Sequence, residues 1–518
     1  MVKYLDNNSG FAQWNSMHAE KKASKFSGIF WWLLLFVFAW WIMGAWFKPQ
    51  NTVVENNQPG VTIEQSNVAK QNVPGREISF DIQGLRISNI SLNEHFKDSK
   101  SNEKIALLSG ENNFVEMGFV SADIQTPNIN TNWEMKSGLM NWNAGGGVHF
   151  TRQILVDGYV ITIIDTIKNN SSREINLTPY LRILSSSENQ MSSVVETGGV
   201  VYANSKLDYT GWNKLNKKSV AYSTVRGSLG FAEQYWETLA AIDANDQTIS
   251  LKKIGDLYSA QTNAAPIKVE SKGENIVRTY VFTGPRMSSV LKTAEDKIPG
   301  IAQTMDYGWF WFFAQPMLWM LNWLFALVGN YGVAIILMTI ILRILIWPLT
   351  RKSFVSTMKM QQMQPELQRV QKLYANDKAR LQMEMMRVYQ THRTSPMSGC
   401  LPMLIQIPIF FALYKALLIS VPMRSAHFLW ISDLAVMDPY FILPILMGAT
   451  MWLQQYLQTS KTQANTNDMM ASTQRVMKWM PVIFTVMFAW MPAGLVLYWT
   501  VSNLFGILQM YIIKKNTK

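Results

Sequence analysis

The sequence predicts a membrane protein that joins a large extramembrane β-sandwich domain to a C-terminal α-helical bundle. Three features of the 518-residue chain predict this fold class. Trp and Phe residues concentrate in two apolar regions, residues 28–47 and the stretch that begins at residue 306. Between them, residues 77–284 alternate apolar and polar side chains with the period of two that is typical of β-strands. Positive charges cluster in short segments beside the apolar runs, as in membrane proteins that keep cations on one side.

Residues 28–47 form an uncharged run that is long enough to cross a hydrocarbon core of about 30 Å as a helix. Three lysines come shortly before it, so residues 1–27 are expected to stay in the cytoplasm. A cleaved signal peptide is the alternative, but the run is too long for one and no small-residue cleavage pattern follows it. We therefore predict a retained transmembrane signal-anchor, followed by a flexible polar linker over residues 48–76.

Residues 77–300 are predicted to form a β-sandwich outside the membrane. The clearest local signal is a β-hairpin whose turn is Asp157-Gly158, between two runs of β-branched and aromatic residues. Similar runs recur along the segment, and many short strands over about 200 residues indicate two packed sheets. A short helix over residues 287–296 is expected to lead back to the bilayer.

The C-terminal region is predicted to contain five further transmembrane helices. The predicted segments are an interfacial amphipathic helix at 306–330, transmembrane helix 2 at 331–350, a cytoplasmic helical hairpin at 351–398, transmembrane helices 3 to 6 at 401–421, 440–457, 476–491 and 494–513, and a cytoplasmic tail at 514–518. A spanning position for residues 306–330 is the alternative, but polar residues and a proline interrupt this run and its four Trp suit an interface. With the anchor, this gives six spans and places both termini in the cytoplasm.

The predicted cytoplasmic hairpin is basic and rich in methionine. Residues 351–393 carry nine Lys/Arg and three Asp/Glu. Asp377 is predicted to cap the second helix, and Pro365 to start or kink the first. The methionines either pack the two helices together or form an adaptable surface for apolar client segments. The basic face is expected to lie beside anionic lipid, with ribosome contact as the alternative.

Motifs of known enzyme chemistry are absent from the sequence, which has no Walker A, HExxH, GxSxG or Gly-rich dinucleotide pattern. The five His are scattered, and the single cysteine, Cys400, excludes an internal disulfide and a Cys-based metal site. Ser356 and Lys359 fit a Ser-x-x-Lys pattern on a polar helix, where a chance match is the simpler explanation. We predict no enzyme activity, no cofactor and no metal. Of the net charge of +12, residues 48–342 contribute −2, with 25 Lys/Arg and 27 Asp/Glu, and the rest of the chain contributes +14. This charge lies in short segments beside apolar runs and not on a folded face, so direct nucleic-acid binding is not predicted.

Arg343 is the most informative residue of the predicted spans. Its guanidinium costs about 2.5–3.5 kcal/mol on insertion scales when it lies within the membrane. Either it reaches the cytoplasmic boundary with its long side chain, or it belongs to a buried polar site. No Asp or Glu occurs in any predicted span of the C-terminal bundle, so its partners are water, amides or a carboxylate that arrives with a substrate. Lys415, near the outer end of its span, is expected to extend outward.

Several motifs of the C-terminal region resemble those of a known family. They are WPLT at 347–350, MQP at 363–365, SGCLPMLIQIPIF at 398–410, DPYFILPILMG at 438–448 and PAGLVLY at 492–498. With the Arg-bearing helix, these motifs resemble the YidC/Oxa1/Alb3 family of membrane protein insertases over residues 306–513. The anchor helix and the large β domain resemble the Gram-negative bacterial form, which implies that the β domain at 77–300 is periplasmic.

The resemblance implies a five-helix core that encloses a hydrophilic groove, open to the cytoplasm and to lipid but closed to the outside. It places the groove arginine at Arg343. An adjacent Tyr-Tyr pair that occurs in some members of the family is replaced here by Tyr498-Trp499. We expect the groove to be lined by Arg343, Thr339, Gln406, Tyr498, Trp499 and Asn503.

The implied function is insertion of hydrophobic segments of nascent proteins into the bacterial inner (cytoplasmic) membrane, without nucleotide hydrolysis. Implied partners are nascent membrane proteins, membrane lipid, the Sec translocon and the ribosome, although the tail at 514–518 is too short for strong tail-mediated ribosome binding. Two other classes remain open. A secondary transporter would show inverted repeats, which the sequence lacks. A membrane-anchored enzyme or binding protein would place its function in residues 77–284.

Overall fold

The computed structural model describes residues 70–97, 102–186, 197–392, 401–458 and 468–517. The predicted signal-anchor at 28–47 and most of the linker lie outside the described residues. The rest of the chain divides into two compact units, which we call the β unit and the bundle unit. The β unit contains residues up to 319 together with 411–427, and the bundle unit contains residues 320–410 and 428–517.

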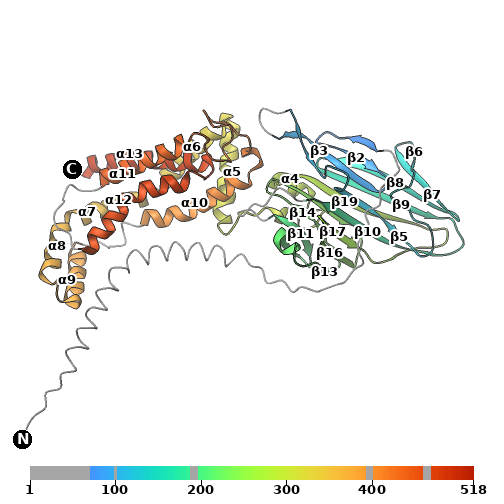
Figure 1. The fold of residues 1–518 in the computed structure, drawn as a ribbon, viewed down its shortest axis with the longest axis horizontal. Helices are drawn as coiled ribbons and strands as arrows, with labels where there is room; N and C mark the ends of the chain where they lie inside the picture. The colour runs from blue at the N-terminus through green and yellow to red at the C-terminus, as the bar shows by residue number, and fades with distance from the viewer. Residues whose placement is uncertain (1–69, 98–101, 187–196, 393–400, 459–467, 518) are drawn as a thin grey trace, which may run out of the picture. The chain divides into compact units, whose positions relative to one another are not determined.

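The β unit is built on two antiparallel sheets (Figure 1). Among the described residues, the first has ten strands: β1 Gln71–Pro74, β2 Ile78–Gln83, β3 Arg86–Phe96, β4 Lys104–Leu107, β5 Phe114–Val120, β10 Ile175–Ser185, β13 Val220–Thr224, β16 Gln247–Ile254, β17 Leu257–Asn263 and β18 Ile267–Val269. The second has nine: β6 Glu134–Lys136, β7 Leu139–Gly145, β8 Val148–Asp157, β9 Val160–Asn169, β11 Gly198–Ala203, β12 Lys206–Gly211, β14 Ser228–Ala232, β15 Trp236–Ile242 and β19 Glu274–Pro285.

Alternation along the strands creates the core between the two sheets. Strand β2, for example, buries every second residue and leaves the intervening ones partly exposed. Phe80 and Leu181 of the first sheet and Ile161 and Ile163 of the second are fully buried members of one apolar cluster. The predicted β-sandwich is therefore confirmed.

The order of the strands is not the order of the chain. The first sheet has a main path β1-β2-β3-β5-β10-β17-β16-β13, and the second runs β12-β11-β14-β15-β19-β9-β8-β7-β6. Strands β5 and β10 are neighbours, although β6 to β9, which lie between them in the sequence, belong to the other sheet.

The predicted hairpin is present, with its turn one residue later than expected. Asp157 pairs with Val160, so the two-residue turn is Gly158-Tyr159. Gly158 has φ +59°, which suits a turn with glycine at its first central position.

Two other predictions concern the ends of this domain. The predicted linker at 48–76 extends too far, because β1 pairs with β2 from Gln71 to Pro74. Most residues of β1 are exposed. An exposed edge strand made of polar residues lacks the apolar alternation that would have predicted a strand. The predicted helix at 287–296 is confirmed as α4, Ser288–Ala294.

Apart from α4, the β unit has a short helix α3 at Trp212–Leu215 and a 3₁₀ turn η1 at Ile301–Thr304. Buried apolar residues of α4, η1 and β15 form a second cluster that includes Ile419. Gln234 Nε2 donates to the Leu418 carbonyl at 2.9 Å, and Val421 belongs to the main core. Residues 411–427 are therefore packed into the β unit.

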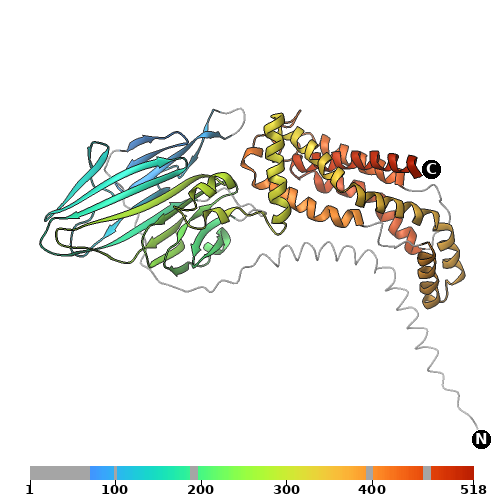
Figure 2. The same cartoon turned by 180° about the vertical axis from the view of Figure 1, so that it is seen from behind.

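The remaining helices are seen in both views (Figures 1 and 2). They are α5 Trp311–Val328, α6 Tyr331–Leu345, α7 Trp347–Gln362, α8 Gln364–Leu373, α9 Lys378–Thr391, α10 Leu401–Ile419, η2 Val421–Met423, α11 Ile442–Gln458, α12 Asp468–Phe488 and α13 Ala493–Thr517. Helix α13 packs against both α6 and α11, and α11 also contacts α12.

The predicted transmembrane helix 2 at 331–350 is not one straight helix. Helix α6 ends at Leu345, and its axis is bent by 65° from that of α7. Pro348 lies in the first turn of α7, where a residue without an N–H is tolerated, and it cannot continue the hydrogen-bond pattern of α6. Among the described residues, α5 and residues 493–515 of α13 are each long and apolar enough to cross a membrane alone, and α6 with α7 could form a third, bent span.

The predicted helical hairpin corresponds to α8 and α9. Asp377 caps α9 by accepting a hydrogen bond from the Arg380 amide at 3.0 Å, and Pro365 lies in the first turn of α8. The methionines differ in their exposure. Met363 is buried between the helices with Met385 packed against the same cluster, whereas Met383 and Met386 are 67% and 53% exposed.

Candidate functional site

The predicted site residues come from three helices of the bundle unit. Asn330 caps α6 by accepting a hydrogen bond from the Val333 amide, and Arg343 lies in the last turn of this helix. Gln406 lies on α10, in the half that belongs to the bundle unit. Tyr498, Trp499 and Asn503 lie on α13.

A chain of polar contacts connects these three helices. Arg343 Nε donates a hydrogen bond to Ser502 Oγ at 2.9 Å, which joins α6 to α13. Ser502 also interacts with the hydroxyl of Tyr498, one turn earlier on the same helix. That hydroxyl accepts a hydrogen bond from Gln406 Nε2 of α10 at 2.8 Å. We call Arg343, Ser502, Tyr498 and Gln406 the polar chain.

The polar chain is shielded from water to different degrees along its length. Tyr498 and Ser502 are almost completely buried, whereas Arg343 and Gln406 are partly exposed. No Asp or Glu occurs within α6, α10 or α13, so no carboxylate on these helices neutralises the guanidinium. The site therefore has a net positive charge and a partly accessible cation, which suits an anionic group on a visiting molecule.

Trp499 joins an aromatic cluster beside the polar chain. Its ring lies 5.5 Å from that of Phe410, 6.0 Å from Phe484 and 5.0 Å from Phe488, measured between centroids. The cluster connects α10, α12 and α13, and Trp499 remains partly exposed. A flat apolar surface thus lies next to the charged one.

Two predicted site residues do not join the polar chain. Thr339 is completely buried, and its hydroxyl donates to the Ile335 carbonyl of its own helix at 2.6 Å. Asn503 is buried against α11, where its amide donates to the Met447 carbonyl and to Thr450 Oγ1, both at 3.3 Å. Asn503 therefore fastens α13 to α11.

Ser502 is the member of the polar chain that the predicted site omitted. Its spacing of four residues from Tyr498 was the available signal, because residues at i and i+4 lie on one face of a helix. Its contact with Arg343 joins positions that are 159 residues apart.

Lys415 differs from its predicted role as an outward-reaching cation. It is largely buried, and its Nζ forms an ion pair with Asp306 Oδ2 within the β unit. The second carboxylate oxygen of Asp306 accepts a hydrogen bond from the Gly308 amide at 2.8 Å. The carboxylate lies before α5, outside the predicted spans 331–350 to 494–513, which is why a search of those spans for acids did not find it.

Among the described residues, no group of three or more His, Cys, Asp or Glu side chains is arranged to hold a metal ion. The structure thus places a polar chain with an unneutralised arginine among apolar helices, and joins this bundle to an antiparallel β-sandwich. Together these features define a multi-helix membrane protein with a partly buried polar site among its helices.

Sequence comparisons place the chain in a family. The family described as 60Kd inner membrane protein matches residues 323–518, and the YidC periplasmic domain matches residues 74–320. The membrane protein insertase YidC of Methylobacillus flagellatus is 32% identical, over 85% of this chain and 82% of that protein. The YidC of Rickettsia conorii is 31% identical, over 90% of this chain and 91% of that protein. The chain belongs to the YidC family of membrane protein insertases, as the sequence motifs predicted.

One solved structure, described as an active YidC insertase with the first transmembrane domain resolved, is 18% identical to the chain. The likeness covers 86% of this chain and 94% of that chain, with a TM-score of 0.37.

Proposed function

We propose that this protein is an insertase and chaperone that moves hydrophobic segments of nascent proteins from the cytoplasm into the inner-membrane bilayer through a hydrophilic groove. The main support for the groove is the polar chain from Arg343 to Gln406, which links three mainly apolar helices. A guanidinium in such a place costs about 2.5–3.5 kcal/mol, so the sequence retains it for a purpose other than stability. The site has no nucleophile–base pair, and the proposed insertion involves no bond chemistry.

In the proposed mechanism, the polar chain receives the polar flank of a client, and the lipid-facing helices guide its apolar segment. The short polar flank of a client enters the groove, where Arg343 attracts its carboxylates and water lowers the cost of desolvation. The apolar segment then moves into lipid along the surfaces of α10 and α12. Val482, Ile483 and Val486 support this route, because each is more than half exposed on α12. Burial of about 20 apolar residues supplies the free energy, so no nucleotide is needed.

The proposed topology places both termini in the cytoplasm and the β unit in the periplasm. The support is the distribution of cations, which flank the apolar helices on the side of the α8–α9 hairpin. We place α5 in the outer interface, although its 18 residues could also span the membrane. Trp311, Trp319 and Trp323 are all exposed on α5, and tryptophan is the residue that membrane interfaces favour.

The proposed partners are nascent membrane proteins, lipid, the Sec translocon and the ribosome. The exposed Met383 and Met386 support client contact at the hairpin, because methionine adapts to apolar surfaces of different shape. The nine cations of residues 351–393 support binding to the ribosome or to anionic lipid.

Site-specific photocrosslinking tests the groove. A benzophenone amino acid at Trp499 keeps an aromatic group in the cluster, and the same probe at Tyr511 of α13, which is 67% exposed, serves as the control. A short membrane protein stalled on the ribosome should crosslink at position 499, and the crosslink should disappear once the chain is released. Equal crosslinking at both positions, or none at position 499, would contradict a groove at the polar chain.

The charge of Arg343 provides a second test. Arg343→Glu should lower insertion of a client with an acidic flank by about tenfold and spare a client of equal length with a basic flank. Arg343→Lys, which keeps the charge, should retain most of the activity toward both. Normal insertion of acidic-flank clients by Arg343→Glu would rule out the electrostatic role.

A further inference from the structure

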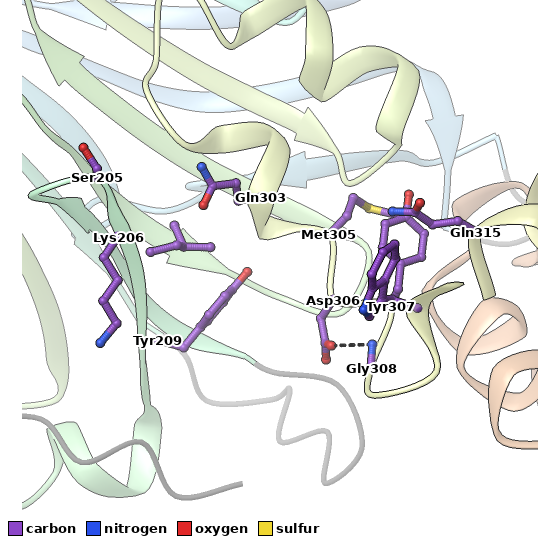
Figure 3. Close-up of a pocket in the computed structure, with 11 residues that line it drawn as sticks. Ser205, Lys206, Tyr209, Gln303, Met305, Asp306, Tyr307, Gly308 and Gln315 are labelled. Carbon is purple, nitrogen blue, oxygen red and sulfur yellow. Dashed lines mark hydrogen bonds between the residues drawn. The ribbon is translucent and has the colours of Figure 1, made fainter. Parts of the chain in front are cut away.

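Two cations, Lys415 and Arg424, hold residues 411–427 against the rest of the β unit. Lys415 pairs with Asp306, whose carboxylate also accepts a hydrogen bond from the Gly308 amide (Figure 3). Arg424 follows η2 and contacts the end of strand β3. The proposed insertion mechanism uses neither contact, and the contact of Arg424 lies beside a histidine.

Arg424 is fixed between two strands of the β unit. Its Nη1 donates to the Phe96 carbonyl at 2.8 Å, and its Nη2 donates to the Lys97 carbonyl. The guanidinium carbon also lies 5.9 Å from the centroid of the Trp236 ring of β15, which is within the range of a cation–π interaction. The end of β3 and the indole of β15 thus hold residues 411–427 through one side chain.

His95 lies at the same place. It directly precedes the two carbonyls that accept from Arg424, and its ring lies 5.0 Å from the ring of Trp236, edge to face. Its Nε2 is 3.1 Å from the hydroxyl of Tyr159. The imidazole and the guanidinium therefore contact the same indole, and a charge on the imidazole would repel Arg424.

The surroundings of His95 favour its neutral form. Burial lowers the pKa of His95 from its ordinary value of 6.5, and the nearby Arg424 lowers this pKa further, against the opposing effect of Glu94. The other titratable side chains around this site are Glu77, Lys97, Glu103 and Tyr159. Lys97 and Glu103 pair with each other, so their charges largely cancel.

We propose that His95 is a pH-sensitive latch: in its neutral form it lets Arg424 hold residues 411–427 against β3, and when protonated it repels Arg424 and releases this segment. A released His95 is in water and takes up a proton at its ordinary pKa, whereas the latched one resists protonation. The latched state is therefore favoured above about pH 6.5 and loses stability as pH falls below this value. In the topology proposed above, the latch faces the periplasm.

Hydrogen exchange of the full-length protein in detergent, at about pH 7.5 and about pH 5, tests the latch. The amides of Met423, Arg424 and Ala426 report on it, because each donates to a backbone carbonyl within residues 420–423. After division by the intrinsic chemical rates, these amides should exchange several-fold faster at the lower pH. His95→Gln, which is neutral at both values, should abolish the acceleration.

A permanent charge provides the opposite test. His95→Lys should give fast exchange of the same three amides at both pH values. Amides of β10 should keep equal corrected rates throughout, which would show that the change is local. Glu237, the neighbour of Trp236 on β15, titrates in the wild type and in His95→Gln alike, so the comparison of these two proteins isolates His95.

His427→Gln is the matched control. His427 is exposed and lies three residues after Arg424, so this variant removes another imidazole of the same segment and should keep the acceleration. Equal corrected rates at the two pH values in the wild type, or an acceleration that persists in His95→Gln, would overturn the proposal. Loss of the acceleration in His427→Gln would overturn His95 as the sensor, and an equal acceleration in β10 would overturn a local latch.

Discussion

The hydroxyl of Ser502 is the only protein acceptor that holds the Arg343 guanidinium among the hydrogen bonds of the described residues. Ser502→Ala should free the guanidinium to leave α13 and should lower insertion of acidic-flank clients several-fold, without loss of folded protein. The hydroxyl of Thr500, two residues earlier, donates to the Val496 carbonyl of its own helix, so Thr500→Val is the matched control. Insertion rates of both variants in reconstituted vesicles provide the comparison, and an equal effect of the two would contradict a specific role for Ser502.

The buried ion pair between Lys415 and Asp306 leads to a second prediction at the scale of single residues, which concerns stability. Lys415→Met leaves the Asp306 carboxylate without its counter-charge and should destabilise the chain by about 3 kcal/mol. Adding Asp306→Asn removes the uncompensated charge and should restore most of the loss. Thermal unfolding of the single and double variants in detergent measures this coupling. If the double variant is no more stable than Lys415→Met alone, the uncompensated Asp306 carboxylate is not the cause of the lost stability.

At the scale of single elements, local signals in the sequence were reliable and long-range ones were not. The cap at Asp377, helix α4 and the β8–β9 hairpin were predictable because each depends on residues that are close in sequence. Asn503 was assigned to the groove because polarity alone does not show which neighbouring helix a side chain faces. The pairing of β5 with β10 likewise depends on a crossover between sheets that period-two alternation does not encode.

The start of α11 provides a prediction at this scale. Asp438 is buried and accepts hydrogen bonds from the Tyr440 and Leu443 amides and from Trp430 Nε1, at 3.1, 2.7 and 3.1 Å. Asp438→Ala should cost about 2 kcal/mol, because a turn amide, an amide in the first turn of α11 and an indole lose their acceptor together. Asp438→Asn keeps one oxygen and should cost about half as much. In Asp438→Ala, amide hydrogen exchange should become faster in the first turn of α11 than in the rest of the helix. An equal change along the whole helix would contradict the capping role.

The stability of the whole molecule should respond to pH through Glu237, a buried residue of β15. Thr304 Oγ1 donates to its carboxylate at 3.0 Å, and Arg286 Nε lies 3.5 Å away. Burial raises the pKa of Glu237 from 4.5 to about 7, despite the opposing effect of Arg286. The unfolded chain therefore ionises first as pH rises, and the folded state loses stability between about pH 4.5 and about pH 7.

Glu237→Gln tests this because glutamine does not titrate. Relative to the wild type, the variant should gain stability on the order of 3 kcal/mol as pH rises from about 5 to about 8. The unfolding temperature of the full chain in detergent at the two pH values shows the difference. Parallel pH profiles of the two proteins would mean that Glu237 has the same pKa in the folded and unfolded states.

The break between α6 and α7 has a consequence for the bilayer itself. Helix α6 contains 15 residues and rises about 22 Å, whereas an ordinary hydrocarbon core is about 30 Å thick. The apolar part of α12, Lys478–Phe488, is shorter still. In the membrane arrangement proposed above, helices this short would be matched by a locally thinner bilayer. The polar flank of a client that enters the proposed groove would then travel a shorter apolar distance than it would elsewhere in the membrane.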